Sequence, residues 1–354
     1  MKNINELLRP QVKGLRAYHV DEPDVPVKLH ANENPYNLSE EIRRFISNEV
    51  SALDFNRYPD PECEDLRQLL AERIGVKKEQ LVLGNGSDEL IQMIIMAFGG
   101  QGFPVVFPTP TFSMYKNIAF SLGEEVMPLP LDESFELEPT SILEKIRCGP
   151  SITFISYPNN PTGNCFSREV IEEIIAQSKG IVVVDEAYFD YSRKTLLDKL
   201  ATSPNLIILR TLSKIGFASL RLGVLVGSTE VADLLNRVRL PYNITSMSRI
   251  AALSSLKFDK EINEGIERII EERAKLYRSL KALGFASPFK TDANFILFRV
   301  NDSEELFNYL IEKGVLIRNL NSAGPLENCM RVTVGTQDEN TIFLQEMKNF
   351  KQKP

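Results

Sequence analysis

Three polar side chains in the middle of the sequence follow short apolar runs and carry complementary chemistry. Lys214 lies in the small-residue turn TLSKIGFAS, and a lysine held in a closed site beside other cations becomes a nucleophile that forms a Schiff base. Asp185 follows the run IVVV, and a carboxylate buried there needs a cationic partner or several hydrogen-bond donors. Tyr188 follows closely, so its hydroxyl could reach the same ligand. For either charged residue alone, a solvated lysine or a helix-capping aspartate is the ordinary explanation.

The segment GNGSDEL, residues 84–90, is a candidate phosphate site. It ends one apolar run and begins an amphipathic stretch, so the amides of Ser87 and Asp88 would face outward at the positive end of a helix dipole. Arg221 adds a cation just before another apolar run. A tight strand-to-helix turn explains the glycines equally well. A dinucleotide-binding fingerprint is less consistent, because Glu89 stands where its third glycine should be.

Two proline-containing turns add an amide and an aromatic ring. In YPNNPTG, residues 157–163, the prolines fix the loop so that the Asn160 amide projects toward a ligand. In PTPTFSMY, residues 108–115, Phe112 offers a flat face on which a heteroaromatic ligand could stack. An ordinary turn and a core phenylalanine are the alternatives. We favour one shared site, because an anion seat, an acid, a lysine and an arginine occur together at the ends of different runs.

These residues share a site only if the apolar runs form one sheet. The runs alternate with amphipathic stretches and lie at 80–86, 103–110, 151–158, 180–188, 205–214 and 221–227. Several are apolar on both faces, as in a sheet that is covered on both sides. The stretches 167–180 and 228–240 have helical spacing and begin with a capping serine. The pattern predicts a three-layer α/β/α domain whose mostly parallel sheet carries the site at its carboxyl edge.

The sequence changes character after about residue 250. The segment 261–285 places isoleucine and leucine side chains along one face and stops at Gly284, which predicts a long connecting helix. A smaller α+β domain is predicted from the segments that follow it, 293–300, 303–314, 315–320 and 329–335. We expect an N-terminal arm that joins the small domain, then a large domain, then the small domain, with the bounds 1–35, 36–250 and 251–354.

Composition narrows the function classes. The 354 residues contain 41 Lys and Arg against 48 Asp and Glu, and this net charge of -7 disfavours nucleic-acid and anionic-membrane partners. The only histidines are His19 and His30, so neither a His-rich metal site nor a Ser/His/Asp triad is expected. The four cysteines form no CxxC pair, and the longest apolar stretch is too short to span a bilayer. We therefore expect a cytoplasmic protein with free thiols and no metal.

Taken in order, these motifs resemble a known family. The set comprises ANENPY (31–36), RYPDP (57–61), GNGSDEL, PNNPTG, DEAY, TLSK followed by LRLG, and MRVTVGT (330–336). It resembles the pyridoxal-phosphate (PLP) dependent aminotransferases of fold type I, and within them the histidinol-phosphate aminotransferase branch. The match extends over essentially the whole chain, which makes it far more specific than any single motif.

The resemblance implies a role for each residue around the cofactor ring. Lys214 would hold PLP covalently, release it to the substrate amine and carry the proton between the substrate carbon and the cofactor. Asp185 would lie against the pyridine nitrogen, where a buried carboxylate favours the protonated ring. Tyr188 and Asn160 would hydrogen bond to the phenolic oxygen, and Phe112 would stack on the ring.

The resemblance also implies how the cofactor phosphate is held and that two chains share each site. The phosphate ligands would be the amides of Ser87 and Asp88, the side chains of Thr211, Ser213 and Arg221, and Tyr58 of the partner subunit. A homodimer follows from the last of these assignments. Family members usually have one more residue between Lys214 and Arg221, often with an aromatic directly after the lysine, so the loop around Gly216 and Phe217 must be built differently.

Substrate recognition is assigned by the same resemblance. Arg331 would bind the substrate anion, because a guanidinium matches both a carboxylate and a phosphate. Arg318, on what we interpret as a neighbouring strand, and Tyr18, in the arm, would complete a grip on the substrate phosphate. Asn34 would lie close to the substrate. A surface arginine and an arm-packing tyrosine are the alternatives for Arg318 and Tyr18.

The expected reaction moves an amino group between L-glutamate and imidazole acetol phosphate, giving histidinol phosphate and 2-oxoglutarate, in histidine biosynthesis. A PLP-dependent decarboxylase of a phosphorylated amino acid, of the threonine-phosphate type, would use the same lysine, acid and arginines. A broader aromatic amino acid aminotransferase is another alternative. A non-catalytic binding protein is less consistent, since packing alone does not require all of these residues in one crevice.

Overall fold

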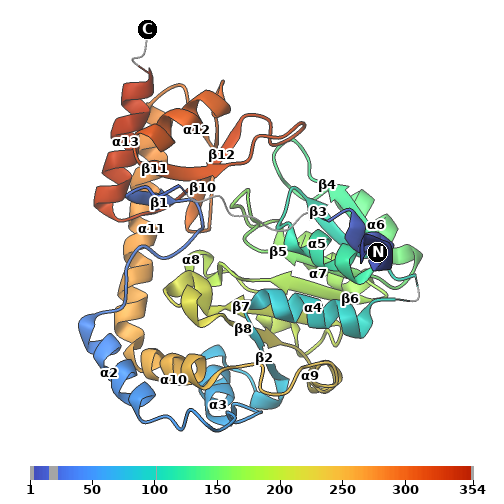
Figure 1. The fold of residues 1–354 in the computed structure, drawn as a ribbon. Coiled ribbons are helices and arrows are strands. Elements are labelled where there is room, and N and C mark those ends of the chain that lie inside the picture. Colours follow the sequence, from blue (N-terminus) through green and yellow to red (C-terminus); the bar gives the residue numbers. More distant parts are fainter. Residues whose placement is uncertain (1–3, 16–22, 101, 352–354) are drawn as a thin grey trace.

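The computed structural model describes residues 4–15, 23–100 and 102–351 (Figure 1). The chain forms two sheets, and the long helix α11 (Asp259–Ala282) runs along the left of the view from the smaller sheet downward. The smaller sheet lies at the upper left with the C-terminal helices, and the larger sheet extends to its right and below it. Within the described residues, no helix combines the length and the apolar character that crossing a membrane requires.

The larger sheet has seven strands in the order β2-β8-β7-β6-β5-β3-β4. Their bounds are β2 (Leu81–Asn85), β3 (Val105–Thr109), β4 (Val126–Pro130), β5 (Ile152–Ser156), β6 (Ile181–Asp185), β7 (Leu206–Thr211) and β8 (Leu222–Val226). Neighbouring strands are parallel except that β8 is antiparallel to both β2 and β7. The predicted mostly parallel sheet is therefore confirmed, and because β8 runs in the opposite direction, its first residue lies at the same edge as the last residues of the other strands.

Alternation along each strand fills two cores, one on each face of this sheet. In β6, Val182 and Val184 join one buried cluster and Val183 joins the other. One face is covered by α4 (Ser87–Phe98), α5 (Met114–Leu122) and α9 (Thr229–Asn236), and the other by α6 (Pro139–Cys148) and α7 (Arg168–Gln177). The predicted capping serines are confirmed, since Ser167 accepts from the Val170 amide and Ser228 from the Val231 amide. The sheet is thus buried on both sides, as its apolar runs predicted.

The smaller sheet has the strand order β1-β11-β12-β10-β9. Its strands are β1 (Val27–Leu29), β9 (Ser287–Pro288), β10 (Phe295–Arg299), β11 (Val315–Asn319) and β12 (Cys329–Thr333), and its helices are α12 (Ser303–Glu312) and α13 (Gln337–Lys351). Strand β1 pairs in parallel with β11, so the N-terminal segment joins this sheet. The long helix α11 is confirmed, and Gly284 just beyond it takes a left-handed φ of 79°, which favours glycine at that position. The domain bounds stay a prediction.

The remaining elements are short or peripheral. The helices are α1 (Pro10–Lys13), α2 (Glu40–Ser51), α3 (Glu64–Ile74), α8 (Phe189–Ser192) and α10 (Ser246–Ser255), and the 3-10 helices are η1 (Ile4–Leu7), η2 (Lys78–Gln80), η3 (Leu197–Lys199), η4 (Leu212–Ile215), η5 (Ala218–Leu220) and η6 (Leu256–Phe258). Two of them, η4 and η5, lie in the connection from β7 to β8, which includes the segment from Lys214 to Arg221.

Candidate active site

A cavity of about 460 Å³ opens between the carboxyl edge of the larger sheet and the smaller sheet. It is lined by most of the residues that the sequence singled out, namely Ser87, Asp88, Phe112, Asn160, Asp185, Tyr188, Thr211, Ser213, Lys214, Arg221, Arg318 and Arg331. Each of the larger-sheet residues ends a strand or follows its end, except Arg221, which precedes the reversed strand β8. The topology therefore gathers side chains that are far apart in the sequence, as in other open α/β sheets.

Three of the predicted site residues are not among the described residues that line the cavity. Tyr18 lies outside the described residues. Asn34 is not among the described residues that line the cavity, and its side-chain oxygen accepts from the Tyr36 amide at 2.9 Å. Tyr58 is 81% exposed and stacks on Tyr242, with ring centroids 4.6 Å apart. The predicted roles of these residues stay predictions.

Asp185 ends β6 as a buried carboxylate with two hydrogen-bond donors. The Tyr115 hydroxyl donates to Oδ2 at 2.6 Å, and the Ala187 amide donates to Oδ1 at 3.1 Å. Burial raises the pKa of Asp185 to about 6, and these two hydrogen bonds oppose that rise. Sequence reasoning missed Tyr115, although it ends the same PTPTFSMY segment that contains Phe112. A carboxylate in this state can pair with a cationic ring nitrogen.

Lys214 lies in η4, directly after β7, with its ammonium 5.9 Å from the centre of the Tyr188 ring. Burial lowers the pKa of Lys214 to about 8, and the positive charges of Arg331 and Arg221 act in the same direction. The Tyr191 hydroxyl donates to the Lys214 carbonyl at 2.6 Å and anchors this turn. A substantial fraction of the amine is therefore neutral near pH 7 to 8, as a nucleophile requires.

The loop from Lys214 to Arg221 closes through two left-handed residues. Gly216 has φ of 112° and Arg221 has φ of 49°, while the Phe217 ring between them is only 2% exposed. Burying Phe217 anchors the middle of the segment, and the turn at Gly216 is favourable only for glycine. Arg221 consequently reaches the cavity despite the short connection.

The start of α4 and residues of the β7–β8 connection form a candidate anion seat. Gly86 precedes α4 with φ of 80°, and a Cβ placed there would lie 2.6 Å from the Arg221 guanidinium. Arg221 also pairs with the Asp88 carboxylate at 3.2 Å. The hydroxyls of Thr211 and Ser213 lie 3.0 Å apart beside them. Free first-turn amides, two hydroxyls and a guanidinium are the donors that a phosphate monoester uses.

Tyr188 and Arg331 connect the floor of the cavity to the smaller sheet. Tyr188 is buried, which raises the pKa of its hydroxyl, and that oxygen accepts from the Asn32 side chain at 2.9 Å. Sequence reasoning missed Asn32, which lies in the same ANENPY motif as Asn34. Arg331 donates to the Asn160 side-chain oxygen at 2.6 Å and to the His30 carbonyl at 2.7 Å. These bonds tie the two sheets together across the cavity.

The two arginines expected to bind the substrate lie opposite each other. Arg318 of β11 and Arg331 of β12 are register partners in the antiparallel pair. Arg331 is 9% exposed, whereas Arg318 is exposed at the rim. The cavity thus has cations at the wall formed by the smaller sheet and a lysine with a carboxylate at the edge of the larger sheet, so a small anionic molecule could contact both.

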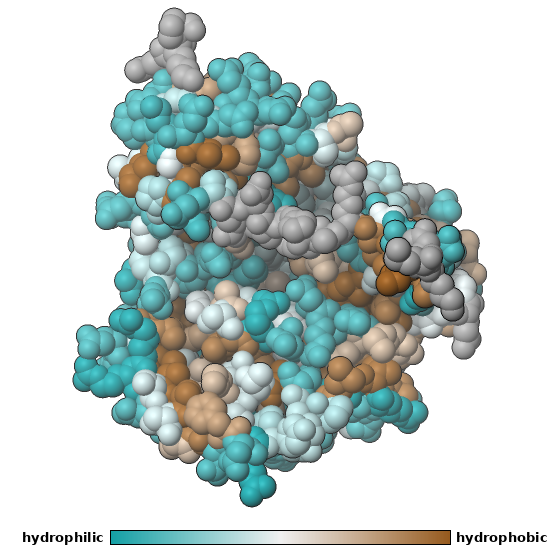
Figure 2. Space-filling view, viewed as in Figure 1, coloured by the Kyte–Doolittle hydropathy of each residue, from teal (hydrophilic) through white to brown (hydrophobic). Residues whose placement is uncertain are grey.

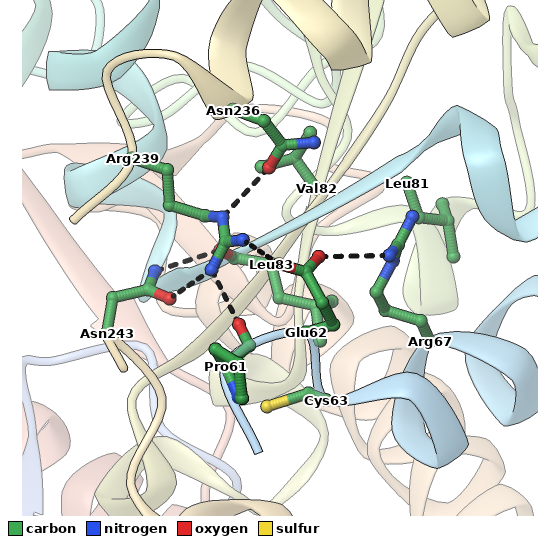
Figure 3. Close-up of a pocket in the computed structure, with 10 residues that line it drawn as sticks. All are labelled: Pro61, Glu62, Cys63, Arg67, Leu81, Val82, Leu83, Asn236, Arg239 and Asn243. Carbon is green, nitrogen blue, oxygen red and sulfur yellow. Dashed lines mark hydrogen bonds and ion pairs between the residues drawn. The ribbon is translucent and has the colours of Figure 1, made fainter. Parts of the chain in front are cut away.

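A second depression is much smaller, about 10 Å³, and is closed by its own hydrogen bonds (Figure 3). Arg239 points into its centre and donates to the Asn236 side chain, the Pro61 carbonyl and the Glu62 carboxylate at 2.8 to 2.9 Å. This network holds the RYPDP segment to the body of the large sheet rather than offering groups to a ligand. Over the described ranges, no group of three or more His, Cys, Asp or Glu residues is placed to hold a metal ion.

The sequence matches proteins of one family along nearly its whole length. The chain is 42% identical over 350 residues to histidinol-phosphate aminotransferase 2 of Nitrosococcus oceani, with 98% of this chain and 97% of that protein covered. It is 40% identical over 346 residues to the histidinol-phosphate aminotransferase of Aquifex aeolicus, with 97% of both proteins covered.

Solved structures share the fold. The crystal structure of histidinol-phosphate aminotransferase from Sinorhizobium meliloti in complex with pyridoxal-5'-phosphate superposes with a TM-score of 0.87 at 21% identity, covering 97% of this chain and 96% of that one. The histidinol-phosphate aminotransferase from Clostridium acetobutylicum superposes with a TM-score of 0.84 at 25% identity, covering 92% and 99%. Residues 24–347 match the family described as aminotransferase class I and II. The chain therefore belongs to the class I and II aminotransferase family.

Proposed function

We propose that this protein is a PLP-dependent histidinol-phosphate aminotransferase, which exchanges an amino group between L-glutamate and imidazole acetol phosphate in histidine biosynthesis. The observation that carries the proposal is one cavity that joins Lys214 and Asp185 on the larger sheet to Arg318 and Arg331 on the smaller one. Relatives of about 40% identity over nearly the whole chain bear the name of this activity.

The residues of the cavity fit PLP. The seat at α4 depends on two glycines, since a Cβ on Gly223 would lie 2.6 Å from the Gly86 carbonyl carbon and a Cβ on Gly86 would lie 2.6 Å from the Arg221 guanidinium. Asp185 supplies the buried acid that a pyridine nitrogen needs, and Lys214 supplies an amine with a lowered pKa. The aromatic face of Phe112 lines the same cavity. A phosphate seat, a buried acid, an amine and an aromatic face are the groups that bind a phosphorylated heteroaromatic aldehyde such as PLP.

When bound, PLP supplies an electron sink that lets the substrate carbon lose a proton. The Lys214 amine takes that proton and returns it, because its lowered pKa lets it serve as base and then as acid near neutral pH. The Asp185 carboxylate holds a proton on the ring nitrogen. Arg331 and Arg318 both bind the substrate phosphate, and this directs the substrate amine toward Lys214. Tyr188 and Asn160 orient the oxygen side of the ring.

The test is a half-reaction followed by a substrate panel. The purified holoenzyme mixed with L-glutamate alone should form 2-oxoglutarate in an amount equal to its active sites, and Lys214→Ala should form none. Histidinol phosphate should turn over far better than histidinol or phenylalanine, because only the phosphate ester pairs with Arg318 and Arg331. Release of carbon dioxide from a phosphorylated amino acid, without transamination of glutamate, would contradict the proposal and favour a decarboxylase.

We also propose that the enzyme is a homodimer in which Tyr58 completes the phosphate seat of the partner subunit. Tyr58 is itself 81% exposed and stacks on Tyr242, and the segments that contain these two residues expose further large hydrophobic side chains by 51 to 69%, namely Phe55, Leu240 and Met247. Figure 2 shows hydrophobic side chains at the surface in the part of the molecule where Figure 1 places α3 and α10. Exposed apolar side chains of this kind mark association surfaces.

Hybrid dimers test the shared site. When inactive Tyr58→Ala and Lys214→Ala chains are mixed and allowed to exchange, one site of each hybrid has both an intact lysine and an intact tyrosine. Activity should therefore recover toward one half of the wild-type value per hybrid. No recovery, with exchange of subunits shown by light scattering and tags, would mean that Tyr58 acts within its own chain. The cytoplasmic location expected from the cysteines stays a prediction.

A further inference from the structure

Tyr115 contacts two of the residues that we assign to the cofactor ring, Asp185 and Phe112. Its side chain is fully buried in α5, and its hydroxyl donates to Asp185 Oδ2 at 2.6 Å. Its ring meets the Phe112 ring edge to face, with centroids 5.5 Å apart and planes at 84°. On another side it stacks on Phe154, with centroids 4.8 Å apart and planes at 14°. Tyr115 is thus held firmly by the core while it touches Asp185 and Phe112 together.

We propose that Tyr115 is a positioning residue of the PLP site, whose hydroxyl keeps the Asp185 carboxylate ionised and aimed and whose ring supports Phe112. The inference rests on the proposed assignment of Asp185 and Phe112 to the cofactor ring. Neither its sequence neighbours nor its helix requires a hydroxyl at this position, since a phenylalanine would fill the same core space. The hydroxyl is therefore explained by its bond to Asp185.

The main influences on the pKa of Asp185 come from four groups and from burial. Tyr115 on α5 and the Ala187 amide donate hydrogen bonds and lower its pKa, while the Lys214 ammonium lowers it further. The Asp88 carboxylate on α4 and the burial itself raise it. Because Oδ2 receives its hydrogen bond from Tyr115, removing that hydroxyl shifts the balance toward the protonated acid. A protonated Asp185 can no longer pair with a protonated ring nitrogen, so cofactor binding should fail at a higher pH than in the wild type.

The experiment measures the dissociation constant of PLP from the full-length enzyme across pH 5 to 9. In Tyr115→Phe the acid-side loss of affinity should move up by about one pH unit, because hydrogen bonds to a charged group have this strength. Binding should then be about fivefold weaker near pH 6 and should approach about tenfold weaker at lower pH. Near pH 9 the variant should bind almost as well as the wild type. The matched control is Tyr309→Phe, which removes a Tyr hydroxyl bonded to Glu346 at 2.9 Å in the small domain and should leave the profile unchanged.

Two further variants separate the possible failures. Tyr115→Leu also removes the ring, so it should weaken PLP binding at every pH by withdrawing the support of Phe112. Asp185→Asn should weaken PLP binding and remove most of the dependence of PLP affinity on pH below neutrality. If Tyr115→Phe superimposes on the wild type while Asp185→Asn does not, the inference about Tyr115 is wrong and the site stands. If Asp185→Asn also binds PLP with the wild-type profile, the assignment of Asp185 itself fails.

Discussion

Replacing Arg331 by glutamine should weaken substrate binding and raise the pKa of Lys214, and the two effects can be measured separately. Arg331 makes charge-assisted hydrogen bonds to Asn160 and the His30 carbonyl, and its charge lowers the pKa of Lys214. In the proposed function Arg331 also binds the substrate anion. Hydrogen bonds to charged groups contribute about 1.5 to 3 kcal/mol, so losing this bond should lower kcat/KM for histidinol phosphate about 10- to 100-fold.

The effect on Lys214 has a defined sign. Two like charges in a partly buried site disfavour the ammonium, so removing Arg331 should raise the pKa of Lys214 from about 8. An interaction between charges several ångströms apart at an effective dielectric constant near 20 corresponds to about one pH unit. At pH 7.5 the variant would therefore hold a smaller fraction of neutral amine than the wild type. The amine would become an effective nucleophile only at higher pH.

The assay is the rate at which PLP recombines with the apoenzyme, followed by absorbance, as a function of pH. The rate rises as the Lys214 amine loses its proton, so its midpoint should lie near 8 in the wild type and higher in Arg331→Gln. Arg318→Gln is the matched control, since Arg318 lies opposite on β11 at the exposed rim and should weaken phosphate binding while leaving the midpoint in place. An unchanged midpoint in Arg331→Gln, or an equal shift in both variants, would refute the reasoning.

Two other substitutions test the phosphate seat at α4 and the contribution of a buried ion pair to stability. Gly223→Ala should reduce PLP affinity at least about tenfold, because its Cβ would press within 2.6 Å of the Gly86 backbone, whereas Gly149→Ala, with nothing within 4 Å, should bind normally in the same titration. Glu186→Gln should lower the free energy of unfolding by about 3 kcal/mol in urea, because it leaves the mostly buried Arg210 without its ion pair, and a loss below 0.5 kcal/mol would show that the pair is not structural.

The local sequence was sufficient for most of the fold. The apolar runs around Val183 and Ile208 became central strands, and Ser167 and Ser228 capped the helices that they were expected to cap. Strand β4 was missed because Pro128 and Pro130 interrupt it, and an edge strand tolerates prolines that a central strand would not.

The sequence predicted those site residues that lie at the ends of strands. Asp185 and Lys214 reach one cavity because they follow neighbouring parallel strands. Tyr115 and Asn32 could not be found in this way, since their partners lie 70 and 156 residues away and are set by packing rather than by a local pattern. The pairing of Arg318 with Arg331 had a local signal, because both lie in short strand-like runs.

The covalent link between PLP and one lysine is the central claim, and it can be measured directly. Borohydride reduction of the holoenzyme, followed by digestion and mass spectrometry, should place the cofactor on the peptide that contains Lys214, with one label per chain. Lys214→Ala should retain no label under the same treatment. A label on any other lysine, or an unlabelled wild-type chain, would contradict the account.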